Sequence, residues 1–333
     1  MSKKKIVILG GGTGTYVLLT GLKKYLPQVD LSVVVTMMDS GGSNRVIRDE
    51  FGLLPTSDIR QCMVALADGD EDQTLRKLFT YRYESGVGIS GMTFGNLFMA
   101  ALTDIYHGNQ KKAIEETCEL LGVAGKIIPV TFDNTNLVAM YENGRQVLGE
   151  HFIDEPREEL LGKKIVEVSV FPKASANTDA LKAIKEANLI VLGPGDLYTS
   201  VISNLVIDGV GKAVAKSTAK KVYIMNLMTR VGQTDNYKAS DHVTEIQRYL
   251  RGNYLDYCLI NSDIKFPKEA LGWYKKVQTY PVEDDLNGTT KTKIIRASLF
   301  DKTIFQKAKS DLLVRSLIRH DPARLAEAVI KLF

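Results

Sequence analysis

The first 40 residues contain a strand, a glycine turn, a helix and a second strand, and this order constrains the fold most strongly. The segment KKIVIL at 4–9 ends in the glycine-rich GGGTG of 10–14. Apolar residues then recur at Val17, Leu18 and Leu22, close to the spacing of one helical face. The next apolar run, LSVVV, has no polar alternation and is typical of strands buried on both faces of a parallel sheet. This order predicts a right-handed βαβ unit.

Similar strand patterns recur in ANLIVLGPG, KKVYIMN and LDYCLIN, with helical patterns between them. The sequence NLVAMYENGRQVLGE alternates around Asn143-Gly144, a dipeptide typical of two-residue hairpin turns with positive φ at both central residues. We therefore predict a single Rossmann-like, doubly wound α/β domain with a mostly parallel sheet over 1–333. It contains a helical region at 58–121 and an inserted β-hairpin region at 127–170. The final segment is expected to form two helices, separated at Pro322.

Composition excludes several function classes. The chain has 333 residues, 44% of them hydrophobic, so it can bury a large core. The net charge of +4 is scattered, which argues against nucleic acid and suits an anionic ligand. No apolar run is long enough to span a membrane. The three cysteines, Cys62, Cys118 and Cys258, are far apart and form no Cys-x-x-Cys pair, so we expect a reduced, cytoplasmic protein.

The glycine loop after the first strand is the first candidate site, because open parallel sheets bind ligands at the carboxyl ends of their strands. Its backbone N–H groups and the following helix N-terminus suit a phosphate. Thr15 stands where the dinucleotide fingerprint requires a third glycine. Anion binding is favoured over a simple tight turn, with these candidate residues: Gly10, Gly12, Thr13 and Gly14.

The loop after the second strand, DSGGS at 39–43, brings one carboxylate, two hydroxyls and exposed backbone to one place. The carboxylate could hold a ribose, bind Mg²⁺ beside a phosphate, or cap the next helix. The sequence leaves these three roles open. The candidates are Asp39, Ser40, Gly41, Gly42 and Ser43.

Further polar loops follow later strands. The sequence GPGDLYTS at 193–200 repeats the pattern of strand, glycine loop and hydroxyls, and NLMTRVGQTDNY adds amide and hydroxyl groups. Thr56, Ser57 or Asp58 is expected to cap a helix. Asn96 begins an apolar helix, where close packing of Gly91 and Gly95 is the structural alternative. The candidate ligand contacts are Gly193, Pro194, Gly195, Asp196, Tyr198, Thr199, Ser200, Asn226, Thr229 and Asn96.

Several catalytic motifs are missing from the sequence. GVGKAVAK has Ala213 where a Walker loop needs Ser or Thr for Mg²⁺, and no Gly-x-Ser-x-Gly or His-Glu-x-x-His is present. Of the four dispersed histidines, His320 is of interest because Arg319-His320-Asp321 forms a compact polar group before a helix.

The motifs ILGGGTG, DSGGSNRVIRDEFGLLPTSDIRQCMVALA, FGNLFMAAL, GPGDLYTSVISNL, NLMTRVGQTDNYKASDHV and IRHDP occur in this order along nearly the whole chain. In the order and spacing of these motifs the chain resembles the YvcK/CofD family. The resemblance implies a Rossmann-like fold with a nucleotide-type ligand over the glycine loops. It also implies site residues at Thr131, Asp133, Asn134, Tyr274 and Arg319.

The two branches of that family imply different functions. In the 2-phospho-L-lactate transferase branch, the aspartate matching Asp39 is associated with Mg²⁺ and a nucleotide-activated phospholactate. The gluconeogenesis-factor branch implies a UDP-sugar such as UDP-N-acetylglucosamine, no required cofactor, and roles in cell shape, peptidoglycan synthesis and growth on gluconeogenic carbon. Proteins of cell-wall synthesis and a second copy of the chain are the expected partners.

The chain departs from the family pattern at two places. Asn44, Arg45 and Val46 follow Ser43 where the family usually has Ser-Gly-Arg, and Met92 replaces a usual histidine. Both changes lie beside the expected phosphate and metal region, so they favour the binding protein over the transferase.

Three hypotheses follow, in descending order. The first is a UDP-sugar-binding regulator. The second is a Mg²⁺-dependent transferase with Asp39 and Asp196 or Asp235 as metal ligands. The third is an NAD-dependent dehydrogenase with Asp39 on the ribose.

Overall fold

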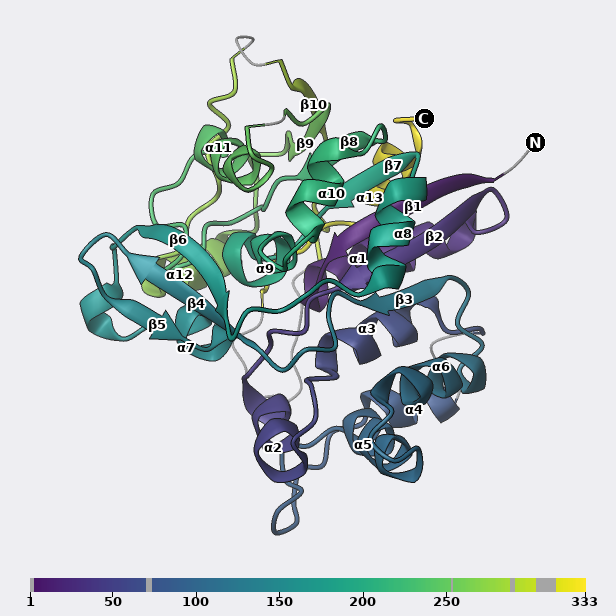
Figure 1. Ribbon diagram of the computed structural model, residues 1–333. Coiled ribbons are helices and arrows are strands. Elements are labelled where there is room, and N and C mark those ends of the chain that lie inside the picture. Colours follow the sequence, from purple (N-terminus) through teal and green to yellow (C-terminus); the bar gives the residue numbers. More distant parts are fainter. Residues whose placement is uncertain (1–2, 70–73, 253, 288–290, 304–315) are drawn as a thin grey trace.

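A parallel sheet forms the centre of the computed structural model, which describes residues 3–69, 74–252, 254–287, 291–303 and 316–333 (Figure 1). Within these residues seven strands lie in the order β10-β9-β8-β7-β1-β2-β3, and every neighbouring pair is parallel. The strands are β1 Lys4–Gly10, β2 Val29–Val35, β3 Lys126–Pro129, β7 Leu189–Leu192, β8 Lys220–Ile224, β9 Tyr257–Asn261 and β10 Lys293–Ala297. The predicted α/β class is confirmed.

Helices cover both faces of this sheet (Figure 1). They are α1 Gly12–Leu22, α2 Gly42–Phe51, α3 Ser57–Leu66, α4 Thr74–Thr80, α5 Phe94–Ile105, α6 Gln110–Leu120, α7 Glu150–Asp154, α8 Thr178–Glu186, α9 Ser203–Leu205, α10 Val210–Lys216, α11 Ala239–Tyr249, α12 Lys268–Lys276 and α13 Pro322–Ile330. A π-helical segment, Leu197–Ile202, precedes α9. Helices therefore dominate 58–121, as predicted.

The direction in which successive strands are added to the sheet reverses between β1 and β7. Leaving β1, the chain first adds β2 and β3 on one side and then returns to add β7 to β10 on the other. At such a switch point the loops after the two central strands diverge and leave a crevice. Both glycine loops predicted from the sequence begin there.

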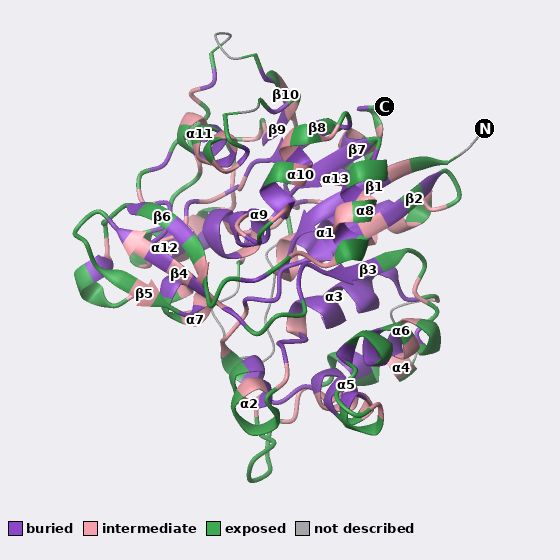
Figure 2. Cartoon of the chain, in the orientation of Figure 1, coloured by how far each residue is buried: buried purple, intermediate pink, exposed green. Residues whose placement is uncertain are grey.

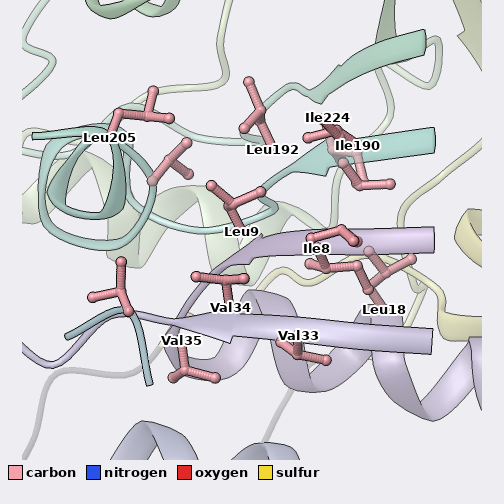
Figure 3. Packing of buried hydrophobic residues seen from close by; sticks show 14 of the residues in the cluster. Ile8, Leu9, Leu18, Val33, Val34, Val35, Ile190, Leu192, Leu205 and Ile224 are labelled. Carbon is pink, nitrogen blue, oxygen red and sulfur yellow. The ribbon is translucent and has the colours of Figure 1, made fainter. Parts of the chain in front are cut away.

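The core lies between the central strands and their helices. Ile8 and Leu9 of β1, Val34 of β2 and Leu192 of β7 are fully buried and lie close together (Figure 3). Figure 2 shows these central strands as largely buried. This explains their lack of polar alternation and gives the loops a rigid base.

The region predicted as a hairpin differs from expectation in two ways. β3 is the edge strand of the large sheet, and the smaller sheet contains three antiparallel strands in the order β5-β4-β6: β4 Asn136–Tyr141, β5 Gln146–Leu148 and β6 Ile165–Phe171. The turn is also longer than predicted, because Tyr141 N donates to Arg145 O across a three-residue loop. Gly144 has φ 79°, whereas Asn143 is not among the positive-φ residues. A single left-handed residue suffices for this turn type.

The C-terminal helix α13 packs against α1, so the end of the chain closes over its beginning. The contact is tight at Gly21, where an added Cβ would lie 1.8 Å from the carbonyl oxygen of Pro322. Pro322 begins this helix and Asp321 caps it by accepting a hydrogen bond from Arg324 N. Most of the other predicted C-terminal helix lies outside the described residues.

Candidate ligand-binding site

A pocket with a volume of about 670 Å³ lies at the switch point. This size is within the range of small-molecule sites. Fifteen predicted residues line it: Gly12, Thr13, Gly14, Asp39, Gly41, Ser43, Pro194, Gly195, Asp196, Thr199, Ser200, Asn226, Thr229, Tyr274 and Arg319.

The two glycine loops pack directly on each other. A Cβ added to Gly14 would lie 2.5 Å from Pro194 O, so this contact requires glycine. Gly11 is the N-cap of α1 and has no side chain to accept hydrogen bonds from the first N–H groups of the helix. These groups and the helix dipole make the loop suitable for an anion.

The Asp39 loop is fixed by hydrogen bonds to α7. Asp39 Oδ1 accepts from Gly41 N at 2.9 Å. Ser40 N donates to Glu150 Oε2 at 3.3 Å, and His151 N donates to Ser40 Oγ at 3.0 Å. The N-cap of α2 is Gly41, with no side-chain capping bond. Asp39 therefore fixes the turn of its own loop immediately before α2.

Carboxylates gather on this side of the pocket. Glu150 lines it together with Asp39, Asp58 and Asp154. Burial, followed by the negative charge of Asp39 and Asp154, raises the pKa of Glu150 well above its usual value. This side of the pocket therefore favours a cation or the hydroxyl groups of a sugar.

Arg230 holds two of the acidic side chains in place. It donates to Asp154 Oδ1 at 3.1 Å through Nε, and its Nε lies 4.0 Å from Asp196 Oδ2. Burial lowers the pKa of Arg230, but Asp154 and Asp196 raise it by more, so the net shift is upward. The guanidinium stays charged and orients both carboxylates.

Asn44 caps α3, a role expected of Thr56, Ser57 or Asp58. Its Oδ1 accepts from Thr56 N at 3.3 Å and Ser57 N at 3.2 Å, and from Ser57 Oγ at 2.9 Å. Thr56 is the N-cap residue by position, but its side chain makes no capping bond. The departure from the family pattern at 44 therefore joins the start of α2 to the start of α3.

The other departures lie outside the pocket. Met92 is 2% exposed and belongs to an apolar cluster with Ile47 and Ala100, against which Val46 packs. Arg45 is exposed and lies 3.9 Å from Asp49. Substituting Met for the usual histidine thus accompanies an apolar contact between α2 and α5.

A hydrogen-bonded chain fixes Asn226 at the wall of the pocket. Asn226 Nδ2 donates to Gly195 O at 2.8 Å, and its Oδ1 accepts from Tyr223 Oη at 2.9 Å. Tyr223 Oη also lies 3.1 Å from Nδ1 of buried His242. The amide therefore ties the end of β8 to the second glycine loop.

Tyr274 positions the last segment of the pocket. Its hydroxyl accepts hydrogen bonds from Leu317 N at 2.9 Å and Ile318 N at 3.1 Å. The same segment brings Arg319 and His320 into the lining.

His320 provides a neutral polar group at this end. Its Nε2 is buried and makes no hydrogen bond within the described part of the chain. Burial lowers the pKa of His320 to about 4, so the ring is neutral at physiological pH. A neutral imidazole nitrogen can accept or donate one bond to a ligand.

Nine predicted residues do not line the pocket: Gly10, Ser40, Gly42, Asn96, Thr131, Asp133, Asn134, Gly193 and Tyr198. Asn96 lies behind the wall, where its Nδ2 donates to Ser43 Oγ and Ser57 Oγ and its Oδ1 accepts from Arg60 Nε. Tyr198 Oη lies 2.9 Å from Tyr237 Oη.

The residues at the end of β3 hold neighbouring segments together. Thr131 Oγ1 donates to Ser175 O, and Asp133 Oδ2 accepts from Ser175 N, both at 2.7 Å. Asn134 Oδ1 accepts from Arg48 Nη2 at 3.3 Å and so contacts α2.

Sequence reasoning missed much of the basic and acidic lining. The residues are Arg60, Arg82, Glu150, His151, Asp154 and Arg230. Arg60 lies on α3, Arg82 between α4 and α5, and the three acidic or histidine side chains on α7, whereas Arg230 lies in the polar loop after β8 whose amide and hydroxyl groups alone were considered. The sequence shows that these residues are charged. It does not show which of the charged side chains scattered along the chain come together in space.

Neither a metal cluster nor a membrane span is found in the described residues. No group of three or more His, Cys, Asp and Glu side chains there is arranged to hold a metal ion. Among the helices that the structure describes, none has the length and apolar character to cross a bilayer.

Comparison with known proteins gives a consistent result. Residues 6–300 match the family model described as 2-phospho-L-lactate transferase CofD. The chain is 36% identical over 333 residues to the gluconeogenesis factor of Bacillus subtilis, covering 99% of this chain and 98% of the relative. It is also 36% identical over 332 residues to the gluconeogenesis factor of Halalkalibacterium halodurans, and this match covers 99% of this chain and 97% of the relative.

A solved structure supports the assignment. The crystal structure of a UPF0052 family protein from Bacillus halodurans has a TM-score of 0.86 and 34% identity, with 99% of each chain covered. The chain therefore belongs to the CofD/UPF0052 family, together with relatives named gluconeogenesis factor.

Proposed function

We propose that this protein binds a UDP-sugar of the UDP-N-acetylglucosamine type and acts as a cytoplasmic regulator of the gluconeogenesis-factor kind. The observation that carries the proposal is the meeting of two glycine loops at the switch point of the sheet, in one pocket with acidic and basic side chains. Such a pocket suits a ligand with a diphosphate and a polyhydroxylated group.

The charged lining suggests how the ligand lies. Backbone N–H groups of the Gly12 to Gly14 loop and Gly195 would hold the diphosphate, with Arg319 as an additional cation. Carboxylates such as Asp39 and Asp154 would accept hydrogen bonds from sugar hydroxyls. Asn226 and Thr229 would contact the ribose or base.

The biological role follows from the relatives' name and the family resemblance. A sensor of a UDP-sugar would connect growth on gluconeogenic carbon with peptidoglycan synthesis and cell shape. In this role the bound form would act through proteins of cell-wall synthesis, and a homodimer is the expected assembly. No cofactor is required for binding.

Thermal shift and calorimetry test the proposal. UDP-N-acetylglucosamine and UDP-glucose should raise Tm by mass action, whereas NAD and guanine nucleotides should not. Each ligand is measured with and without Mg²⁺. Absence of binding heat for both UDP-sugars, at concentrations that detect micromolar affinity, would refute the proposal.

The alternative is a Mg²⁺-dependent transferase of the 2-phospho-L-lactate type, which the description of the family model favours. Asp39 and Glu150 could share a cation, since both line the pocket and the negative charge of Asp39, after burial, helps to raise the pKa of Glu150. Mg²⁺ usually combines one or two carboxylates with ligand phosphates, and it would polarise a phosphoryl oxygen. Metal-dependent turnover of a nucleotide-activated phospholactate, lost in Asp39→Asn, would support this function.

A further inference from the structure

One end of the pocket differs in chemistry from the rest. Apolar side chains gather there: Leu227, Met228, Trp273, Val277 and Ile318, together with the ring of Tyr274. Leu227, Tyr274 and Ile318 belong to a small hydrophobic cluster against which Trp273 packs while remaining partly exposed. Trp273 is therefore the partly exposed aromatic side chain at this end, and a flat apolar group that covered it would gain free energy by burial.

The strand order places this end away from Asp39, whereas Asp154 and Asp196 lie beside Arg230, two residues after Met228. Asp39 follows β2, the glycine loops follow β1 and β7, Leu227 and Met228 follow β8, and Trp273 lies on α12 after β9. Because these strands are neighbours in the order β2-β1-β7-β8-β9, the lining runs from Asp39, past the two glycine loops, to the aromatic side chains.

Backbone contacts make the aromatic end rigid. Thr229 N donates to Tyr280 O at 2.7 Å, and Tyr280 N donates to Thr229 Oγ1 at 3.0 Å. Met228 also forms an isolated bridge with Pro281. Trp273 and Tyr274 pack edge to face with ring centroids 5.0 Å apart. A preformed aromatic surface of this kind binds a base without a large ordering cost.

We propose that Trp273 is the stacking platform for the nucleobase of the ligand. The proposal rests on the proposed nucleotide-binding function and adds an orientation: base at Trp273, diphosphate at the glycine loops, and sugar toward Asp39 and Glu150. Stacking on an aromatic face tolerates different bases, so Trp273 supplies affinity, and the polar groups around it determine which base is preferred.

Fluorescence tests the proposal directly, because Trp273 is the only tryptophan in the sequence. Excitation at wavelengths that tyrosine does not absorb then reports on this residue. UDP and UDP-N-acetylglucosamine should change its emission, whereas pyrophosphate and N-acetylglucosamine 1-phosphate, which lack a base, should bind without that change.

Two substitutions separate stacking from packing. Trp273→Leu should weaken binding of UDP by roughly tenfold or more and leave pyrophosphate affinity unchanged, whereas Trp273→Phe should retain most of the UDP affinity. Phe171→Leu is the matched control, because Phe171 is 67% exposed on β6 and does not line the pocket. Circular dichroism and Tm verify that each variant is folded.

The outcomes distinguish the two proposals. If the wild-type protein binds UDP but its fluorescence is unchanged and Trp273→Leu binds equally well, the base lies elsewhere and the orientation is wrong, while nucleotide binding stands. If the wild-type protein binds none of the nucleotides, the proposed function fails and the base site fails with it.

Discussion

At the scale of single residues, the pocket combines close backbone approach with crowded charge. Gly14 allows the two glycine loops to touch, and Glu150 lies among other carboxylates. These residues differ in what a substitution should reveal. The glycine sets the geometry of the site, and the glutamate sets its response to pH.

Replacing Gly14 by Ala should separate the loops. The new Cβ would lie 2.5 Å from Pro194 O, so the backbone must shift at a cost of roughly 1–3 kcal/mol. We expect a lower Tm and loss of UDP-sugar binding by calorimetry. Gly272→Ala is the matched control, because a Cβ there meets nothing within 4 Å and alanine favours the helix. Equal binding by Gly14→Ala would show that loop contact is dispensable.

Glu150→Gln should stabilise the protein at neutral pH. Burial and the nearby Asp39 and Asp154 raise the pKa of folded Glu150, so the folded state binds its proton more tightly than the unfolded chain. Stability is consequently lost as pH rises from the ordinary carboxyl pKa through the raised folded pKa. Urea unfolding should show a higher free energy of unfolding for the variant at pH values above the raised pKa of Glu150. Below about pH 4 the variant and the wild-type protein should be equally stable in this respect. A gain that is independent of pH would contradict this assignment.

At the scale of elements, side chains from one segment hold the ends of others. Asn44 on α2 caps α3, and Tyr274 on α12 holds the segment that carries Arg319. The pocket therefore depends on residues that need not contact a ligand.

Asn44→Ala should destabilise α3. It removes the acceptor for two backbone N–H groups, and loss of a cap typically costs about 1 kcal/mol, up to about 2. Asn109→Ala is the comparison, since exposed Asn109 accepts a hydrogen bond from Lys112 N at the start of α6 through its Oδ1. Chemical denaturation should show the larger loss for Asn44→Ala. An equal or smaller loss would mean that water replaces the amide.

Tyr274→Phe should weaken ligand binding more than it weakens the fold. Leu317 N and Ile318 N lose their acceptor, and an unpaired buried group costs about 1–3 kcal/mol unless the segment moves. Movement would displace Arg319 and His320. Calorimetry should show reduced UDP-sugar affinity with a small change in Tm, while Tyr280→Phe, with a half-exposed ring, should bind normally.

These elements also show what could be predicted from the sequence. Local patterns identified β1, β2 and the glycine loops, because buried parallel strands and glycine turns have strong local signatures. The hairpin turn was predicted one residue too short, and β3 was placed with the hairpin instead of at the edge of the large sheet. Strand pairing is a long-range property, and nothing in the local sequence of β3 distinguishes the two partners.

The same limit explains the errors in the site. Strand-end residues such as Asp39 and Gly195 were found because topology places their loops together. Asn96 and Tyr198 have comparable polar side chains but are buried behind the wall or among tyrosines. Whether such a side chain faces a pocket depends on packing between distant segments, which periodicity does not encode.

At the scale of the whole molecule, α13 packs on α1 and joins the last part of the chain to the first. The central strands β1 and β7 are likewise far apart in sequence and paired in the sheet. Among the described residues, separating the first part of the chain from the last would therefore expose core residues of β1, β7, α1 and α13.

Gly21→Ala should therefore destabilise the entire protein. A Cβ at this position would lie 1.8 Å from Pro322 O and 2.9 Å from the Cβ of Ala326, so α13 must move away from α1. We expect the free energy of unfolding to fall by roughly 1–3 kcal/mol. Calorimetry should still show a single cooperative transition. Two resolved transitions would instead indicate that α13 and its surroundings unfold independently.

The closure of the chain on itself also has a consequence for protein synthesis. The wall of the pocket includes Gly12 near the beginning of the chain and His320 near its end. A nascent chain on the ribosome cannot complete this wall until His320 has emerged, more than 300 residues after Gly12. A fragment that ends before His320 would lack this part of the wall, so a truncated chain that still folds its central strands would not form the complete pocket.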